Sequence, residues 1–209
     1  MNVCTSCECV DNIFACLYNN VMNVSLITAV KTCCFIGHRK IEITDELKKQ
    51  VYDYIENLIV NKNVKIFLFG SRSDFDFLCH TVVDELKTKY TDIKLVAYNC
   101  RSESSFLESE REKWEEIYSH KEKRPVHLLC VDEVFDHKTK YKSGRAAYVE
   151  RNYAMIDDSD YCLFYYDENY LPPKRKQSKR NLFEYQPQSG TALAYKYALQ
   201  KKKCIHNFF

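Results

Sequence analysis

Three short polar segments, each containing a glycine, hold the residues of this sequence best suited to bind a phosphorylated ligand. They are residues 37–39 (GHR), 70–76 (GSRSDFD) and 189–191 (SGT). Arg39 can bind a phosphate through two parallel hydrogen bonds, and His38 can stack on a base or donate to a phosphate. A helix that starts at such a turn presents N–H groups and a positive dipole end to an anion. Together these features predict a site for a nucleotide-type small molecule, the alternative for each being an ordinary turn between strand and helix.

The second of these segments offers both donors and acceptors of hydrogen bonds. Ser71 and Ser73 supply hydroxyl groups, and Arg72 adds a positive charge. Asp74 or Asp76 can accept hydrogen bonds from the hydroxyls of a ribose. Asp74 can equally be the N-cap of the helix that follows.

The glycines indicate where strands end and helices begin. The chain has four glycines; Gly37 and Gly70 each follow directly on a predicted strand, and Gly190 starts a predicted helix. In an open α/β sheet these places share one rim, outside the carboxyl ends of the strands, where ligands bind. Glycine there permits a positive φ or a close approach to a ligand.

Apolar runs alternate with helical periodicity from residue 31 onward. This alternation predicts an α/β protein with a Rossmann-like open, mostly parallel sheet and helices on both faces. We expect residues 31–209 to form a single domain with a loop insertion at 167–188, and residues 1–30 to be a poorly ordered N-terminal extension. The predicted strands are 32–36, 64–69, 93–98, 126–131, 161–166 and 203–208, and the predicted helices are 44–61, 75–90, 106–120, 143–157 and 190–201.

Charge and cysteine content narrow the class of protein. The 31 basic and 29 acidic residues give a net charge of +2, whereas a dedicated nucleic-acid-binding domain is usually clearly basic. The 11 cysteines are an odd number, and the N-terminus lacks the basic start of a signal peptide. These features favour reduced thiols and a cytoplasmic protein. The apolar run 24–30 is far too short to span a bilayer, so no membrane partner is expected.

We assign no ligand-binding role to three other features of the sequence. The cysteines at 4, 7, 9 and 16 lack the paired spacing of a zinc ribbon or finger. They are interpreted as free thiols, and neither a metal nor a cofactor is predicted. The basic run 174–180 lies between prolines and is interpreted as a solvated loop rather than a nucleic-acid contact. Cys33 and Cys34 are neighbours in a strand and should pack on its opposite faces.

With these residues in hand, the chain resembles the SLOG superfamily, and within it the YpsA-like branch. TCCFIGHRKI looks like that branch's opening strand and GHR signature, and IFLFGSRSDFDFLCHTVVDELKTKY looks like its second strand and phosphate-loop helix. YVERNYAMIDDSDYCLFYY is similar to its Arg-Asn helix and following strand, and SGTALAYKYALQKKKCI to its closing helix and strand. The matches follow one another in the expected order over about residues 31–209.

The resemblance implies a Rossmann-like fold and a nucleotide-derived ligand, and it adds Arg151 and Asn152 to the candidate site. The complete set of candidate ligand-binding residues is Gly37, His38, Arg39, Gly70, Ser71, Arg72, Ser73, Asp76, Arg151, Asn152, Ser189, Gly190 and Thr191.

Two departures from the family pattern bear on function. Ser71 and Ser73 stand where the branch usually has glycine. Because a Cβ disfavours positive φ, we expect the loop to differ in shape or in ligand. Relatives that hydrolyse nucleoside monophosphates have a loop of the form PGG-x-GT-x-x-E. Ala194 stands at the position of that glutamate, which favours binding without turnover.

The preferred function is therefore the binding or sensing of a nucleotide-derived small molecule, NAD-like, ADP-ribose-like or another nucleotide. The alternatives are a nucleotide-cleaving hydrolase of the N-glycosidic or phosphoribohydrolase type, with Glu150, Asp157 or Asp76 as its base, and a single-stranded nucleic-acid binder. We expect Arg39 and Arg151 to converge on one anion. The alternative for Arg151 is a surface ion pair with Glu150 or Asp157. A homo-oligomer is compatible with the sequence.

Overall fold

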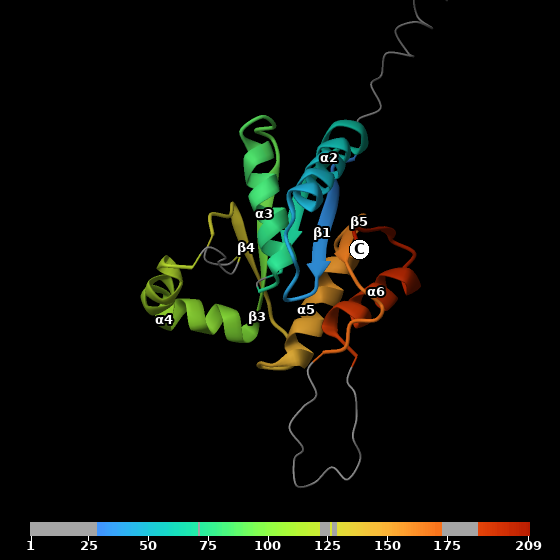
Figure 1. Ribbon diagram of the computed structural model, residues 1–209. Helices are drawn as coiled ribbons and strands as arrows, with labels where there is room; N and C mark the ends of the chain where they lie inside the picture. Colours follow the sequence, from blue (N-terminus) through green and yellow to red (C-terminus); the bar gives the residue numbers. More distant parts are fainter. Residues whose placement is uncertain (1–28, 71, 122–125, 127–128, 173–187) are drawn as a thin grey trace, which may run out of the picture.

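The structure, a computed structural model, describes residues 29–70, 72–121, 126, 129–172 and 188–209. Over these residues it contains a parallel six-stranded sheet in the order β4-β3-β2-β1-β5-β6, with helices on both faces (Figure 1). The predicted α/β fold is confirmed. The strands are β1 Lys31–Gly37, β2 Val64–Phe69, β3 Lys94–Cys100, β4 Glu133–His137, β5 Tyr161–Tyr165 and β6 Cys204–Asn207, and the helices are α2 Asp45–Lys62, α3 Asp74–Lys87, α4 Arg101–Ser119, α5 Arg145–Asp157 and α6 Gly190–Gln200.

The central strand β1 contributes to two hydrophobic cores, one on each face of the sheet. Cys33 and Phe35 pack with residues of α2 and α3, whereas Cys34 and Ile36 pack with residues of α5 and α6. Alternate residues of a strand point to opposite faces, so a strand covered on both sides is apolar at every position. The predicted placement of Cys33 and Cys34 on opposite faces is confirmed.

The order of the strands defines where the sheet can receive a ligand. From β1 the chain winds outward through β2 and β3 to β4, and then crosses to β5 on the other side of β1. Open α/β sheets bind ligands at the carboxyl ends of strands where the winding reverses in this way. Gly37, the last residue of β1, pairs with Tyr165, the last residue of β5. The GHR segment therefore leaves the sheet at the point of reversal.

The predicted fourth strand, residues 126–131, is wrong: β4 lies at 133–137. Val126 is fully buried in the core beside α3, and the carbonyl oxygen of Cys130 lies 2.8 Å from Nε2 of His80 on that helix. In this segment, Val126, Leu129 and Val131 pack in the core that includes α3, and none of its described residues belongs to a strand. The true β4 is an edge strand with exposed residues such as Val134, which is why no apolar run indicated it.

The helices lie close to their predicted positions except for α4, which begins at Arg101 instead of residue 106. Its start is set by Glu103, whose Oε2 accepts a hydrogen bond of 2.9 Å from the backbone N–H of Cys100. A carboxylate three residues after the N-cap satisfies a donor that the first helical turn leaves without a partner. In the described part of the chain, no helix is long and apolar enough to cross a membrane.

Gly37 is required by packing and not by a positive φ, which neither it nor Gly70 has. A Cβ on Gly37 would lie 2.4 Å from Cβ of the fully buried Phe75. We predict that Gly37→Ala lowers the free energy of unfolding by about 1–3 kcal/mol, because the added methyl overpacks the core. Gly190→Ala is the matched control, since nothing lies within 4 Å of its Cβ position. Equilibrium denaturation measures both variants, and an unchanged midpoint for Gly37→Ala would contradict the prediction.

Candidate functional site

A pocket of about 700 Å³ lies at the carboxyl end of β1. Its walls come from the N-terminal turns of α3, α5 and α6 and from the segment that follows β5. Of the candidate residues, Gly70 lies beside the pocket against Arg151, and Ser71 falls outside the described residues. The candidates that line the pocket are Gly37, His38, Arg39, Arg72, Ser73, Asp76, Arg151, Asn152, Ser189, Gly190 and Thr191.

His38 connects the end of β1 to the segment after β5. Its Nε2 accepts a hydrogen bond of 2.9 Å from the backbone N–H of Asp167, and its ring lies against Tyr170 with the centroids 4.2 Å apart. Burial lowers the pKa of His38, with the Asp167 hydrogen bond and charge opposing that shift. Because Nε2 can accept a hydrogen bond only when it is unprotonated, this geometry requires a neutral ring. Burial favours the same neutral form. Its Nε2 is occupied by the backbone, which makes His38 a support of the pocket wall.

The loop that begins at Gly70 ends in a closed helix cap. Ser73 is the N-cap of α3: its Oγ accepts a hydrogen bond of 2.9 Å from the N–H of Asp76, and the Asp76 carboxylate accepts one of 3.2 Å from the N–H of Ser73. Capping by Asp74 is therefore wrong. Asp74 is the first helical residue, and its carboxylate lies 3.4 Å from Nζ of Lys40.

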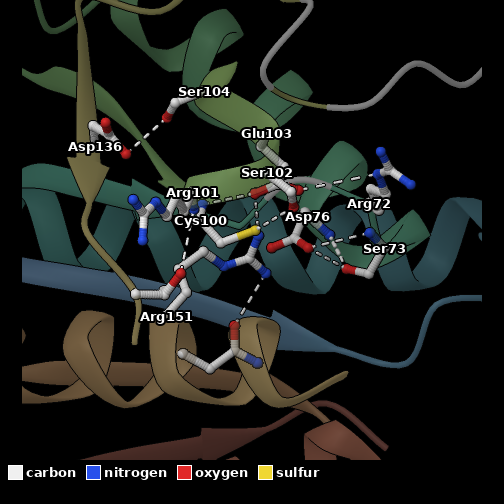
Figure 2. A network of polar contacts seen from close by, with 12 residues as sticks. Arg72, Ser73, Asp76, Cys100, Arg101, Ser102, Glu103, Ser104, Asp136 and Arg151 are labelled. Atoms are coloured by element: carbon white, nitrogen blue, oxygen red, sulfur yellow. Dashed lines mark hydrogen bonds and ion pairs between the residues drawn. The ribbon is translucent and has the colours of Figure 1, made fainter. Parts of the chain in front are cut away.

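A buried ion pair holds the helices around this loop together (Figure 2). Arg151, only 5% exposed, donates from Nη1 to Glu103 Oε2 at 3.2 Å and from Nη2 to Asn152 Oδ1 at 3.1 Å. A Cβ on Gly70 would lie 2.9 Å from Arg151 Nη2. Gly70 thus gives room to a guanidinium of the protein itself.

The surface pair of Arg151 with Glu150 or Asp157, the alternative considered for this residue, does not form. Glu150 accepts from the backbone N–H of Lys140, and Asp157 pairs with Lys201. Glu103 was not predicted as part of the site. The one signal for it was an acidic residue three positions after the end of a strand, a spacing typical of a helix cap.

Asp76 is the one carboxylate among the described residues that line the pocket. Burial raises the pKa of its side chain, while hydrogen bonds from Ser73 and the charge of Arg151 oppose that effect. One carboxylate oxygen, Oδ2, is used by the cap of α3. The other oxygen, Oδ1, is buried and has no hydrogen-bond partner among the described residues.

The SGT turn joins the C-terminal helix to the first strand. Ser189 caps α6, with its Oγ accepting from the N–H of Ala192 at 3.0 Å. Thr191 donates from Oγ1 to the carbonyl oxygen of Gly37 at 3.0 Å. The amino end of α6, with its positive dipole end, therefore lies beside the end of β1.

Four charged or tyrosine side chains of the pocket wall were not predicted from the sequence: Lys40, Arg145, Tyr148 and Tyr170. Arg145 and Tyr148 belong to the first turn of α5, directly after Gly144, the one glycine to which no site segment had been assigned. With them the lining contains more cationic than anionic side chains. Such an excess attracts an anionic ligand. The cationic residues are Arg39, Lys40, Arg72, Arg145 and Arg151, and the anionic residue is Asp76.

A family model, YpsA, described as the YspA SLOG family, matches residues 34–199. The match includes all the segments that supply the candidate residues, from the end of β1 to the first turn of α6. A comparison with curated proteins finds no match.

The buried pair gives the first prediction for this site. Arg151→Ala would leave Glu103, whose side chain is 1% exposed, without its guanidinium. We predict a loss of about 3 kcal/mol in the free energy of unfolding, because the buried Glu103 carboxylate then has only the more distant Arg72 guanidinium, at 4.0 Å, as a counter-charge. The double variant Arg151→Met, Glu103→Gln should recover part of this loss, since it removes both charges.

Urea denaturation measures these variants. Lys201→Ala is the control, because it breaks an exposed pair with Asp157 and should shift the midpoint little. A wild-type midpoint for Arg151→Ala would show that the pair does not support the fold.

His38 gives a prediction for pH dependence. Its folded-state pKa lies below its ordinary value of 6.5, so between the two values the unfolded state binds more protons. The contribution of His38 to stability is therefore complete above about pH 6.5 and is lost as the pH falls through the folded pKa. We expect His38→Gln to show a weaker loss of stability than the wild type between pH 7.5 and 5.5, measured by urea denaturation. If the free energy of unfolding fell equally with pH in the variant and the wild type, the prediction would be contradicted.

Proposed function

Since the chain belongs to the YpsA family of SLOG proteins, we propose that it binds a nucleotide-derived small molecule, NAD-like, ADP-ribose-like or another nucleotide, in the pocket beside β1. The observation that carries the proposal is the meeting of three glycine-containing segments, distant in sequence, around one cationic pocket where the winding of the sheet reverses. Its volume falls within the range of pockets for small ligands and cofactors.

The chemistry of the lining suits the parts of a nucleotide. Arg39 and Arg145 are suited to phosphate oxygens, to which guanidinium groups bind bidentately. Tyr148 and Tyr170 supply aromatic rings on which a base can stack. Asp76 is suited to accept from a hydroxyl group. A neutral apolar ligand would leave these charged groups without a partner.

Binding or sensing is favoured over hydrolysis. Ala194, at the position of the hydrolase glutamate, is fully buried in the core between α6 and the sheet. Of the three acids considered as a base, only Asp76 lines the pocket, because Glu150 and Asp157 are bound elsewhere. The proposal therefore predicts recovery of the bound nucleotide intact. Release of a free base or a ribose phosphate during incubation would favour the hydrolase.

A cytoplasmic location is part of the proposal. Cys34 and Cys162 are register partners on neighbouring strands, and both are buried free thiols. Adjacent reduced cysteines are typical of proteins kept in a reducing compartment. The proposed ligand, a cellular nucleotide, is compatible with that compartment.

The proposal predicts a specific effect of Arg39→Ala. Arg39 is an exposed pocket residue, so its removal should preserve the melting temperature of the unliganded protein. Affinity should fall about tenfold or more, because a charge-assisted hydrogen bond to phosphate is lost. The ligands for the measurement are AMP, ADP, ATP, NAD and ADP-ribose, screened by thermal shift and then titrated calorimetrically.

Arg101→Ala is the matched control, since Arg101 is an exposed arginine outside the pocket lining. It should bind as the wild type does. Wild-type affinity in Arg39→Ala, or the absence of any stabilising nucleotide, would count against the proposal.

A further inference from the structure

The two oxygens of the Asp76 carboxylate have different surroundings. Oδ2 accepts from the backbone N–H and the hydroxyl of Ser73, which closes the cap of α3. Oδ1 is buried and has no hydrogen-bond partner among the described residues, although Asp76 lines the pocket and is only 5% exposed. A buried carboxylate oxygen without a donor is costly, and in native proteins it usually has a partner. Asp76 Oδ1 is therefore an acceptor at the pocket wall that has no donor of good geometry among the described residues.

This acceptor lies where a phosphate would be repelled. The carboxylate is at the amino end of α3, the end at which an anion would otherwise bind, and the capping box already uses it. The nearby Arg72 and Arg151 have Glu103 as a counter-charge, with Nε of Arg72 4.0 Å and Nη1 of Arg151 3.2 Å from its carboxylate. This part of the pocket favours a neutral hydrogen-bond donor over an anion.

The end of β1 has the opposite character. Arg39 lies two residues after Gly37, and the carbonyl oxygen of Gly37 is bound by Thr191 in the first turn of α6. The arginine and a helix amino terminus thus meet at one place, together with the open side of Gly190, where nothing lies within 4 Å of the Cβ position. Both the cation and the helix dipole favour a phosphate there.

We propose that the ligand is recognised through a phosphorylated ribose, with its phosphate at the end of β1 and its 2′- or 3′-hydroxyl donating to Asp76 Oδ1. The inference rests on the proposed function and specifies the part of the nucleotide that the pocket selects. It makes the protein a receptor for ribonucleotides that discriminates against the deoxy forms. The discrimination arises because a deoxy ligand leaves the buried oxygen without a donor while still displacing water from the pocket.

The decisive experiment changes the ligand and leaves the protein intact. Wild-type protein is titrated calorimetrically with ADP, 2′-deoxy-ADP and 3′-deoxy-ADP, and in parallel with ribose 5-phosphate and 2-deoxyribose 5-phosphate. We expect ADP to bind and at least one of its deoxy forms to bind about tenfold or more weakly. Ribose 5-phosphate should bind without a base.

The same ligands are then titrated against Asp76→Asn. We expect weaker binding of ADP and the loss of its advantage over the deoxy forms, because the charged acceptor is gone. Asp74→Asn is the matched control: Asp74 lies two residues away on the same turn but outside the pocket lining, so the discrimination should persist. If Asp76→Asn does not fold, the comparison of ligands on the wild-type protein still decides.

The outcomes separate this inference from the proposed function. Equal affinity of the wild-type protein for ADP and both deoxy forms, with binding still weakened by Arg39→Ala, would overturn the selection of ribose and leave nucleotide binding intact. Binding of neither ADP nor ribose 5-phosphate, together with no stabilisation by any nucleotide of the screen, would overturn both. Discrimination that persists unchanged in Asp76→Asn would overturn the role of Asp76.

Discussion

Arg151 is a permanent positive charge enclosed by protein. Several other residues supply the hydrogen-bond acceptors, the counter-charge and the space that its guanidinium requires. Removing a guanidinium from water is costly unless its N–H groups find acceptors and its charge finds a partner. Glu103 from α4 and Asn152 from α5 accept its hydrogen bonds, and Asp76 from α3 adds a second carboxylate nearby. Gly70 supplies the space, because any side chain there would meet the guanidinium. One buried charge thus determines residue types on three helices and on the loop after β2.

This arrangement gives a physical reason for the division of the pocket. Charges near α3 are mostly satisfied within the protein, whereas Arg39 at the end of β1 is exposed. A ligand therefore meets a polar, nearly neutral wall on one side and a cationic one on the other. The position of the site follows from strand order, since only the reversal of winding beside β1 brings α3, α5 and α6 to the same rim.

Features that depend on local pattern could be predicted from the sequence. The alternation of apolar runs with helical periodicity gave the fold class, and the positions of Gly37 and Gly190 marked two of the segments that line the pocket. Features that depend on partners distant in sequence could not. The pairing of Arg151 with Glu103 spans 48 positions, and nothing in either local segment indicates it. The predicted strand at 126–131 was wrong for the same reason. Val126, Leu129 and Val131 pack in the core that includes α3, whereas an edge strand such as β4 needs no apolar run. The cysteines at 4, 7, 9 and 16 and the basic run 174–180 lie outside the described residues.

The bond from Thr191 to the carbonyl oxygen of Gly37 connects residues 154 positions apart. During synthesis the ribosome releases the chain from its amino end, so β1 emerges long before the helix that must dock beside it. Contacts of such long sequence separation form late, since a large loop has to close first. The pocket therefore has no complete wall until Thr191 has been added to the chain. Until β5 has been made, the edge of β1 that pairs with it stays open, so the order of synthesis supplies both strand neighbours of β1 before the pocket can be completed.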